Sequence, residues 1–139
     1  MPDGPSIFTR IVQGELPCHR VFESPTVLAF LDINPLAVGH TLVIPKREVV
    51  RLEQLPPEEA ADLARALVEV APRVLAAVGA TDYNLLQNNG PLSGQEVPHV
   101  HFHIIPRHTG DELGFRWKPQ TGDHAALADL AARILPSEG

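Results

Sequence analysis

Three histidines alternate with apolar residues in the segment His99-Val-His-Phe-His-Ile-Ile105. A period of two is typical of a β-strand, on which His99, His101 and His103 share one face while the residues between them face a core. On a helix, the middle imidazole would point nearly opposite the outer two. Imidazole provides a neutral lone pair and, once protonated, a hydrogen-bond donor near neutral pH. The segment therefore predicts a chemical site, against the alternative of a solvated sheet face or buried histidines with structural partners.

Metal binding is one chemistry that such a segment could support, because His-x-His on a strand is a frequent ligand pair. The first and third histidines begin about 13 Å apart on a strand that rises 3.3 Å per residue, which is too far for easy convergence on one ion. Only Glu96 and Asp111 lie near in sequence to supply a carboxylate. Metal binding is accordingly the second interpretation.

Phosphate chemistry is the preferred interpretation, because one ring can attack phosphorus while its neighbours hold phosphoryl oxygens. The loop Asn88-Asn-Gly-Pro-Leu-Ser-Gly94 precedes the histidines. Its glycines allow backbone N–H groups to approach an anion closely. Such a loop alone is a weak signal, but beside three histidines it predicts a phosphate cradle.

The elements that position this segment follow from its flanking patterns. Strands are predicted where β-branched, aromatic and aliphatic residues gather between turns: 21–22, 27–31, 40–45, 83–87 and 99–105. Helices are predicted over 7–13, capped by Ser6, and over 57–78 and 123–135. Pro72 interrupts the second helix, which predicts a bend between residues 68 and 72 or two abutting helices. Together these elements predict an α+β fold with an antiparallel sheet of about five strands, two longer helices, and helices on one face.

Composition limits the kinds of partner and location. A chain of 139 residues with 44% hydrophobic residues predicts one domain over residues 1–139. The formal charge of −6 disfavours nucleic acid as a partner, although a pocket for one small anion remains compatible with it. Cys18 is the only cysteine, so no intrachain disulfide forms and a reducing cytoplasm is the predicted location. The chain has neither a bilayer-length apolar run nor a basic leader, so no membrane partner is expected.

Residues 99–105 resemble the signature of the histidine triad superfamily, His-φ-His-φ-His-φ-φ with φ apolar, at every position. The resemblance extends to three supporting blocks in the family's order, residues 6–17, 29–35 and 39–46. It runs from about residue 6 to residue 107, which leaves 108–139 as a C-terminal tail and helix. A homodimer with one continuous ten-stranded sheet is implied by the family, and residues 115–119 would reach the partner's active site.

The resemblance implies hydrolysis or transfer at the α-phosphate of a purine nucleotide, through a covalent nucleotidyl-histidine. Substrates of this kind are nucleoside 5′-phosphoramidates, dinucleoside polyphosphates and aminoacyl adenylates. By the same resemblance His101 is the nucleophile and His103 contacts the phosphate. His99 orients the site through its backbone carbonyl, and His40 supports it from the neighbouring strand. The scheme needs no metal and no cofactor.

The resemblance also implies a set of nucleotide-binding residues. Asp32 matches the position that binds the ribose hydroxyls, although it could be only a turn residue before Asn34-Pro35. The apolar base pocket is matched by Phe8, Ile11, Leu16, Phe30, Ile33 and Leu42, each of which could also be core. The phosphate loop is matched by Asn88, Gly94, Gln95, Glu96 and Val97.

Departures from the family pattern sharpen these expectations. Ser6 and Thr9 stand where many microbial relatives have the Cys-x-x-Cys that helps to hold a structural zinc, so that zinc is predicted to be absent. The third histidine, His103, disfavours the hexose uridylyltransferase branch, which has glutamine there. Glu96 replaces a serine of the Hint branch and predicts a bias toward amine or cationic leaving groups. The rival functions are a nucleotide-binding or scaffold protein with vestigial catalysis and, third, a histidine-ligated metal hydrolase.

Overall fold

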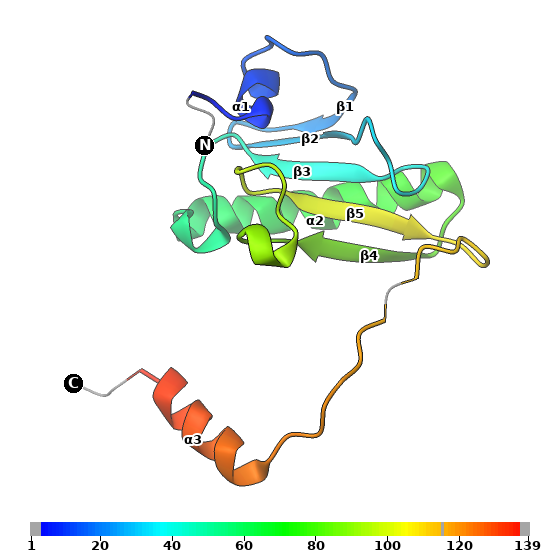
Figure 1. Cartoon of the computed structure of the whole chain (residues 1–139). Helices are drawn as coiled ribbons and strands as arrows, with labels where there is room; N and C mark the ends of the chain where they lie inside the picture. Colours follow the sequence, from blue (N-terminus) through cyan, green and yellow to red (C-terminus); the bar gives the residue numbers. More distant parts are fainter. Residues whose placement is uncertain (1–3, 115, 137–139) are drawn as a thin grey trace.

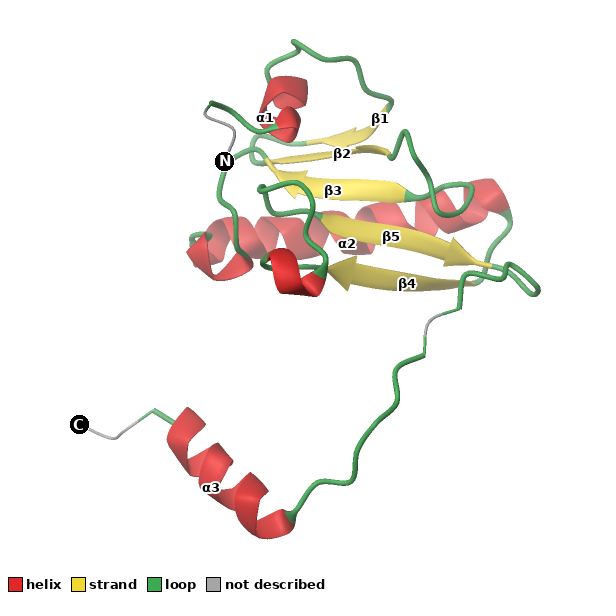
Figure 2. Cartoon of the chain, in the orientation of Figure 1, coloured by secondary structure: helices red, strands yellow, loops and turns green. Residues whose placement is uncertain are grey.

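This computed structural model describes residues 4–114 and 116–136 of the chain. Five strands form one antiparallel sheet in the order β1-β2-β3-β5-β4 (Figure 1). They are β1 (Arg20–Glu23), β2 (Val27–Leu31), β3 (Thr41–Pro45), β4 (Asp82–Gln87) and β5 (Phe102–Arg107). Figure 2 shows the sheet with the long helix α2 (Pro57–Val78) across one face. The predicted α+β fold with five antiparallel strands is confirmed.

Strands β2 and β3 are buried on both faces, because alternate residues enter different clusters. Val27, Ala29 and Val43 pack in the cluster that includes α2. The residues between them pack on the opposite face with the short helix α1 (Ile7–Val12). Ser6 caps α1 by accepting a hydrogen bond from the Thr9 N–H at 3.0 Å. The prediction that the helices share one face is wrong, since the apolar side of α1 covers the face that α2 leaves open.

Helix α2 begins with proline at its first position and two glutamates in its first turn, and it ends at Gly79 in the left-handed conformation. Its buried side carries Leu63, Ala66, Val70, Ala71 and Val74. The 22 residues form one helix, so the prediction of two abutting helices is wrong. Pro72 lies on the exposed side, near Val68, which is 77% exposed. The Val68 carbonyl that loses its helical donor therefore lies on the solvent side of the helix.

Strand β5 begins at Phe102 rather than at residue 99. Its pairing with β3 runs from Thr41↔Ile104 to Val43↔Phe102, and its pairing with β4 ends at Gln87↔Phe102. The first two histidines of the segment thus precede the hydrogen-bonded ladder. They follow a loop that contains a single 3₁₀ turn, η2 (Pro91–Ser93), and a second such turn, η1 (Leu52–Gln54), lies before α2.

The C-terminal helix α3 (His124–Ile134) is capped by the Asp123 carboxylate, which accepts from the Ala126 N–H at 2.9 Å. It lies away from the sheet at the end of an extended segment (Figure 1) and has no buried residue. Phe115, at the start of the tail predicted to reach a partner, lies outside the described residues. Among the residues that were described, no helix is long and apolar enough to cross a bilayer.

Candidate functional site

His99 is completely buried and bonded through both ring nitrogens. Its Nε2 lies 2.8 Å from the carbonyl oxygen of Pro45, which can only accept, so Nε2 carries the proton. Its Nδ1 lies 2.7 Å from the hydroxyl of Ser6 and accepts from it. The ring of His99 is therefore held between β3 and the start of α1.

His101 is 6% exposed, and its Nδ1 lies 2.7 Å from the backbone carbonyl oxygen of His99. Because a carbonyl only accepts, His101 carries its proton on Nδ1 and has its lone pair on Nε2. The ring also meets Phe8 edge-on, with the ring centres 4.9 Å apart. The hydrogen bond between the backbone of His99 and the ring of His101 is the one that the resemblance implies.

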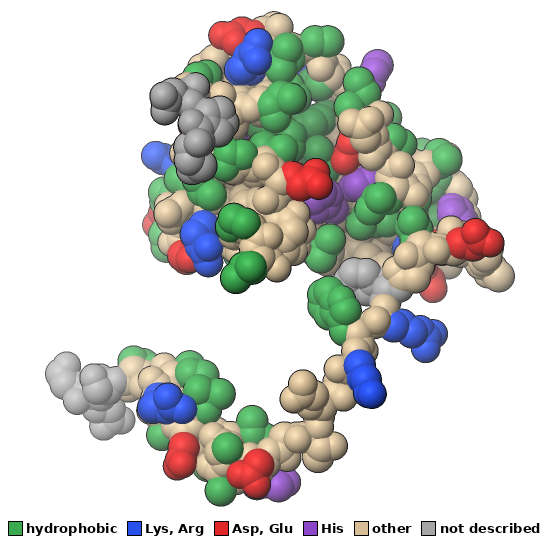
Figure 3. Space-filling view, viewed as in Figure 1, with side chains coloured by type: hydrophobic (Ala, Val, Ile, Leu, Met, Phe, Trp, Pro, Cys, Tyr) green, Lys and Arg blue, Asp and Glu red, His purple; other side chains and the backbone are tan. Residues whose placement is uncertain are grey.

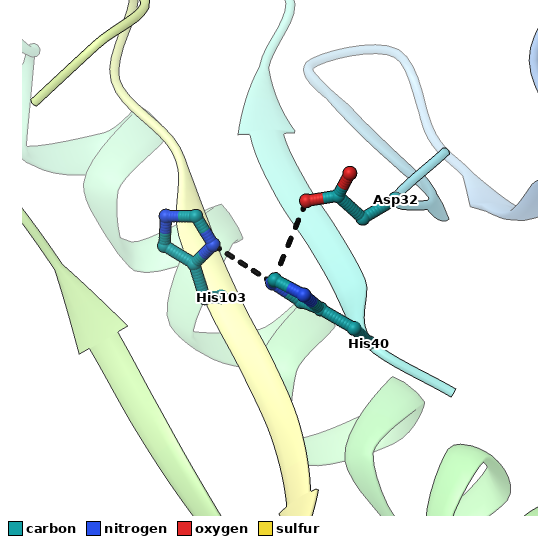
Figure 4. Close-up of side chains that lie close together, drawn as sticks. All are labelled: Asp32, His40 and His103. Carbon is teal, nitrogen blue, oxygen red and sulfur yellow. Dashed lines mark hydrogen bonds and ion pairs between the residues drawn. The ribbon is translucent and has the colours of Figure 1, made fainter. Parts of the chain in front are cut away.

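A chain of two imidazoles fixes the tautomer of His103 in the same way. The Leu36 N–H donates to His40 Nδ1 at 3.0 Å, so His40 carries its proton on Nε2. His40 Nε2 then donates to His103 Nδ1 at 2.9 Å (Figure 4), which leaves the proton of His103 on Nε2. The ring centres of His101 and His103 are 4.8 Å apart. A lone pair and an N–H donor thus stand side by side, one suited to a phosphorus atom and the other to a phosphoryl oxygen.

Burial keeps all four histidines neutral near pH 7. It is the largest cause that lowers the pKa values of His40, His99 and His101 below the ordinary 6.5. For His103, burial and the neighbouring His101 and His40 lower the pKa to about 4. The carboxylate of Asp32, with its Oδ2 3.6 Å from His40 Nε2, opposes the pKa shifts of His40, His101 and His103, and Glu48 opposes that of His99. An uncharged His101 is the form with a lone pair for attack.

The metal interpretation can be tested against these hydrogen bonds. Asp32, His40 and His103 each offer a ligand atom, and these atoms lie within 4.8 Å of one another. An ion on His40 Nε2 would move its proton to Nδ1, where the Leu36 N–H already donates. Both ring nitrogens of His99 are already bonded, and Nδ1 of His101 is bonded to the His99 carbonyl. The hydrogen-bond network therefore suits neutral imidazoles better than a metal.

The six residues predicted for the base pocket fall into two groups. Phe8, Ile11, Phe30 and Leu42 are buried together, with Leu16 packed partly against them. Ile33, in contrast, is 84% exposed next to Asp32. The face around them shows histidine side chains beside an acidic group and among apolar ones (Figure 3). Of the predicted set, Ile33 and the half-buried Asp32 and Leu16 are the more open to a ligand.

The predicted phosphate loop is braced by one of its own members. Gln95 accepts from the Gly90 N–H at 2.7 Å and donates to the Val50 carbonyl at 2.8 Å, so its side chain holds the loop. Gly94 has a φ of +98°, a conformation that favours glycine, and a Cβ there would lie 3.7 Å from Asn88 Nδ2. Glu96 is exposed. The carbonyl of Val97, which is partly buried, accepts from the His99 N–H at 2.8 Å.

Ser6 and Thr9 stand at the two positions where the sequence predicts that zinc-binding cysteines are replaced. Both residues are held by hydrogen bonds to side chains of the site. Thr9 donates to the Glu48 carboxylate at 2.7 Å, and the Ser6 N–H donates to the same oxygen. The absence of a structural zinc stays a prediction. Glu48 itself was not foreseen, and neither were Leu36, Pro45 and Val49; the carbonyl of Val49 accepts from the Val100 N–H at 2.8 Å. Three of these four act through backbone groups, which have no side-chain signature, and Glu48 lies far in sequence from His99.

Known proteins resemble the chain in both sequence and structure. Residues 13–110 match the HIT domain family. An uncharacterized HIT-like protein of Methanocaldococcus jannaschii is 49% identical over 105 residues, which cover 76% of this chain and 81% of the relative. An adenosine 5′-monophosphoramidase of Schizosaccharomyces pombe is 44% identical over 112 residues, covering 80% of this chain and 81% of the relative.

A solved structure gives the same assignment. The crystal structure of a HIT family member from Bacillus subtilis is 34% identical, with a TM-score of 0.87. The match covers 97% of this chain and 100% of that chain. On the matched domain and these relatives, the chain belongs to the HIT family.

Proposed function

We propose that the protein is a nucleotidyl hydrolase or transferase that acts at the α-phosphate of purine nucleotides, with nucleoside 5′-phosphoramidates as the leading substrate class. The observation that carries the proposal is the 2.7 Å hydrogen bond from His101 Nδ1 to the His99 carbonyl, because it leaves the Nε2 lone pair for attack. The adenosine 5′-monophosphoramidase of S. pombe supports this substrate class by its likeness to the chain.

The reaction proceeds in two displacements. His101 Nε2 bonds to the α-phosphorus while the bond from phosphorus to the leaving group breaks, and the leaving group takes up a proton as it departs. Water then attacks the phosphorus, the bond to Nε2 breaks, and a proton is released with the nucleoside monophosphate. Two easier steps replace one difficult step. The His99 carbonyl stabilises the positive charge on the nucleotidylated ring through the Nδ1 proton that it already accepts.

The neighbouring groups hold the substrate. His103 donates its Nε2 proton to a non-bridging oxygen, His40 keeps that proton in place, and Asp32 binds the ribose hydroxyls. Ile33 and Leu16 contact the base at the open side of the apolar cluster. Backbone N–H groups of the loop that contains Asn88 and residues 94–97 bind the phosphate. No step in this scheme uses a metal or a cofactor.

Glu96 selects the leaving group. Its exposed carboxylate repels a polyphosphate product and favours an amine. The test is the ratio of kcat/KM for an adenosine phosphoramidate to that for a dinucleoside polyphosphate. Glu96→Ser is expected to lower this ratio, and an unchanged ratio would remove the assignment.

The protein acts on a small purine nucleotide in the cytoplasm, as a homodimer whose two sheets join into one, and does not bind nucleic acid or membranes. A scaffold protein that only binds nucleotide is the rival. Both functions predict binding of AMP or GMP, and only the enzyme predicts multiple turnover.

The deciding experiment compares wild-type protein with His101→Ala on adenosine 5′-phosphoramidate. We expect turnover to fall by about 10³-fold or more in the variant, as for loss of other nucleophiles, with folding retained by circular dichroism. Rapid quenching with labelled substrate should trap nucleotide on the wild-type polypeptide alone. Wild-type turnover in His101→Ala would contradict the proposal, and inhibition of metal-containing protein by chelators would support the metal hydrolase instead.

A further inference from the structure

The peptide group between His99 and Val100 lies outside the sheet ladder, which begins two residues later at Phe102. Its carbonyl oxygen accepts from His101 Nδ1 at 2.7 Å. Its N–H, on Val100, donates to the carbonyl oxygen of Val49 at 2.8 Å. Because a peptide group is planar, the bond to Val49 fixes the direction in which the His99 carbonyl points. Something other than strand pairing must therefore hold Val49 in position.

The segment that carries Val49 follows directly on β3, and its neighbours also reach His99. Pro45, the last residue of β3, accepts from His99 Nε2 at 2.8 Å, so the histidine is contacted at its ring as well as at its peptide group. Between these two contacts stands Glu48. Its Oε1 accepts from both the Ser6 N–H and the Thr9 hydroxyl, the latter at 2.7 Å. These two bonds join the segment to the start of α1.

The hydrogen bonds that Glu48 accepts also determine which group the Ser6 hydroxyl donates to. Ser6 Oγ accepts from the Thr9 N–H at 3.0 Å and donates to His99 Nδ1 at 2.7 Å. The Thr9 hydroxyl, 3.4 Å from the same Nδ1, gives its proton to Glu48 instead. The accepted hydrogen bonds lower the pKa of Glu48, so it is an anion near neutral pH. The Ser6 hydroxyl is thereby left as the donor to His99 Nδ1, and the Thr9 hydroxyl as the donor to Glu48.

From this network we propose that Glu48 is a positioning residue for the reaction at His101, which it never touches. By holding residues 46–49 against α1, it fixes the ring of His99 through Ser6 and the peptide group of His99 through Val49, and so the carbonyl that keeps the proton of His101 on Nδ1. The inference rests on the proposed function, because it assumes that the lone pair on His101 Nε2 is used. It makes the reaction depend on Glu48, a residue outside the histidine segment.

The test uses Glu48→Ala and Glu48→Gln in the full-length protein. We expect kcat on adenosine 5′-phosphoramidate to fall roughly tenfold in Glu48→Ala with KM changed less than about twofold, because small misplacements of a reacting group act on kcat. Glu48→Gln, which retains a side-chain oxygen as acceptor, is expected to recover about half of that loss on a logarithmic scale.

A second readout does not depend on turnover. The proton on His101 Nδ1 is observed by ¹H–¹⁵N NMR, and its exchange with water should be at least about fivefold faster in Glu48→Ala, since local opening sets the exchange rate. The ¹⁵N shifts of His101 should also report some of the Nε2-protonated tautomer. Wild-type exchange and wild-type kcat in Glu48→Ala would overturn the proposal.

Two control variants separate positioning from stability. Glu15→Ala removes a carboxylate that is paired with Arg10, also at α1, at 3.2 Å, without touching His99. Val70→Ala destabilises the protein from α2, on the opposite face of the sheet. Both should keep wild-type kcat and exchange at a temperature well below unfolding. If they lose as much kcat as Glu48→Ala, Glu48 is merely structural. Failure of the proposed function would appear separately, as activity retained in His101→Ala.

Discussion

His40 Nε2 lies 2.9 Å from His103 Nδ1, and a backbone group on the other side of His40 decides which nitrogen holds the shared proton. The Leu36 N–H can only donate, so its 3.0 Å bond to His40 Nδ1 places the proton of His40 on Nε2. His103 must then accept on Nδ1 and carry its own proton on Nε2. The Leu36 amide thereby determines, through His40, that Nε2 of His103 is a hydrogen-bond donor.

This relation predicts that His40→Leu weakens catalysis without removing it. His103 would lose its donor at Nδ1, and its proton would divide between the two nitrogens. We expect kcat/KM on a phosphoramidate to fall about tenfold, which is typical for loss of a hydrogen bond that orients a reacting ring. The ¹⁵N shifts of His103 should show the mixed tautomers. His108→Gln, at an exposed histidine beyond β5, is the control and should leave both measurements unchanged.

The activity should decline on acidification at a pH below the ordinary histidine pKa of 6.5. Burial lowers the pKa of His101, so the ring remains neutral through that pH and protonates only in more acid solution. Protonation occupies the Nε2 lone pair, and the rate falls with it. The measurement is the pH profile of kcat/KM, which reports the free enzyme. A profile that stays flat to pH 4, or an acid limb above 6.5, would contradict the assignment.

Stability should also fall with pH, and the direction follows from proton counts. The pKa of His103 is lowered to about 4 in the folded protein, while an unfolded chain has the ordinary 6.5. Between these values the unfolded state binds a proton that the folded state does not, so the free energy of unfolding decreases as the pH falls from 6.5 to about 4. Above 6.5 both states are neutral and the contribution is constant.

Thermal unfolding of the wild type and of His103→Asn isolates that contribution. The drop in Tm between pH 6.5 and pH 4.5 should be smaller in the variant, since one half-buried neutral histidine has been removed. His101 and His40, which face His103, keep their own share of the dependence, and Asp32 opposes it. Equal drops in the two proteins would show that His103 titrates normally.

Much of the sheet could be predicted from local patterns. The hairpin of β1 and β2, the cap at Ser6 and the five strands follow from the types of residue at neighbouring positions in the sequence. The predicted strand over residues 99–105 was right in its alternation and wrong in its start. Its first residues are ordered by ring and peptide bonds to Pro45 and Val49, and such partners lie far away in sequence.

Errors elsewhere have a similar origin. Pro72 is tolerated within α2 because it lies on the exposed side, and the position of that side depends on the packing of the whole helix. Glu48 shows no sequence pattern that sets it apart from a surface carboxylate, and its importance appears only when α1 is brought beside β3. Side-chain alternation thus located the candidate site, while the groups that orient it required the tertiary structure.

The predicted base-pocket residues can be separated by comparing an exposed member with a buried one. Ile33 is 84% exposed, and Leu42 is 5% exposed within the cluster that also holds Phe8 and Phe30. Ile33→Ala should change the free energy of unfolding by less than about 0.5 kcal/mol, as for other surface substitutions. It should raise KM for the nucleotide about fivefold, because it removes apolar area that the base would cover.

Leu42→Ala should give the opposite result. Truncation of a buried leucine lowers the free energy of unfolding by about 3 kcal/mol, because transfer free energy is lost and a cavity is left behind. At a temperature where the variant is folded, its KM should stay within about twofold of wild type, since the residue lies beneath the surface that a ligand meets. Urea unfolding and steady-state kinetics on both variants provide the test. A large rise in KM for Leu42→Ala with none for Ile33→Ala would place the base deeper, against the buried cluster itself.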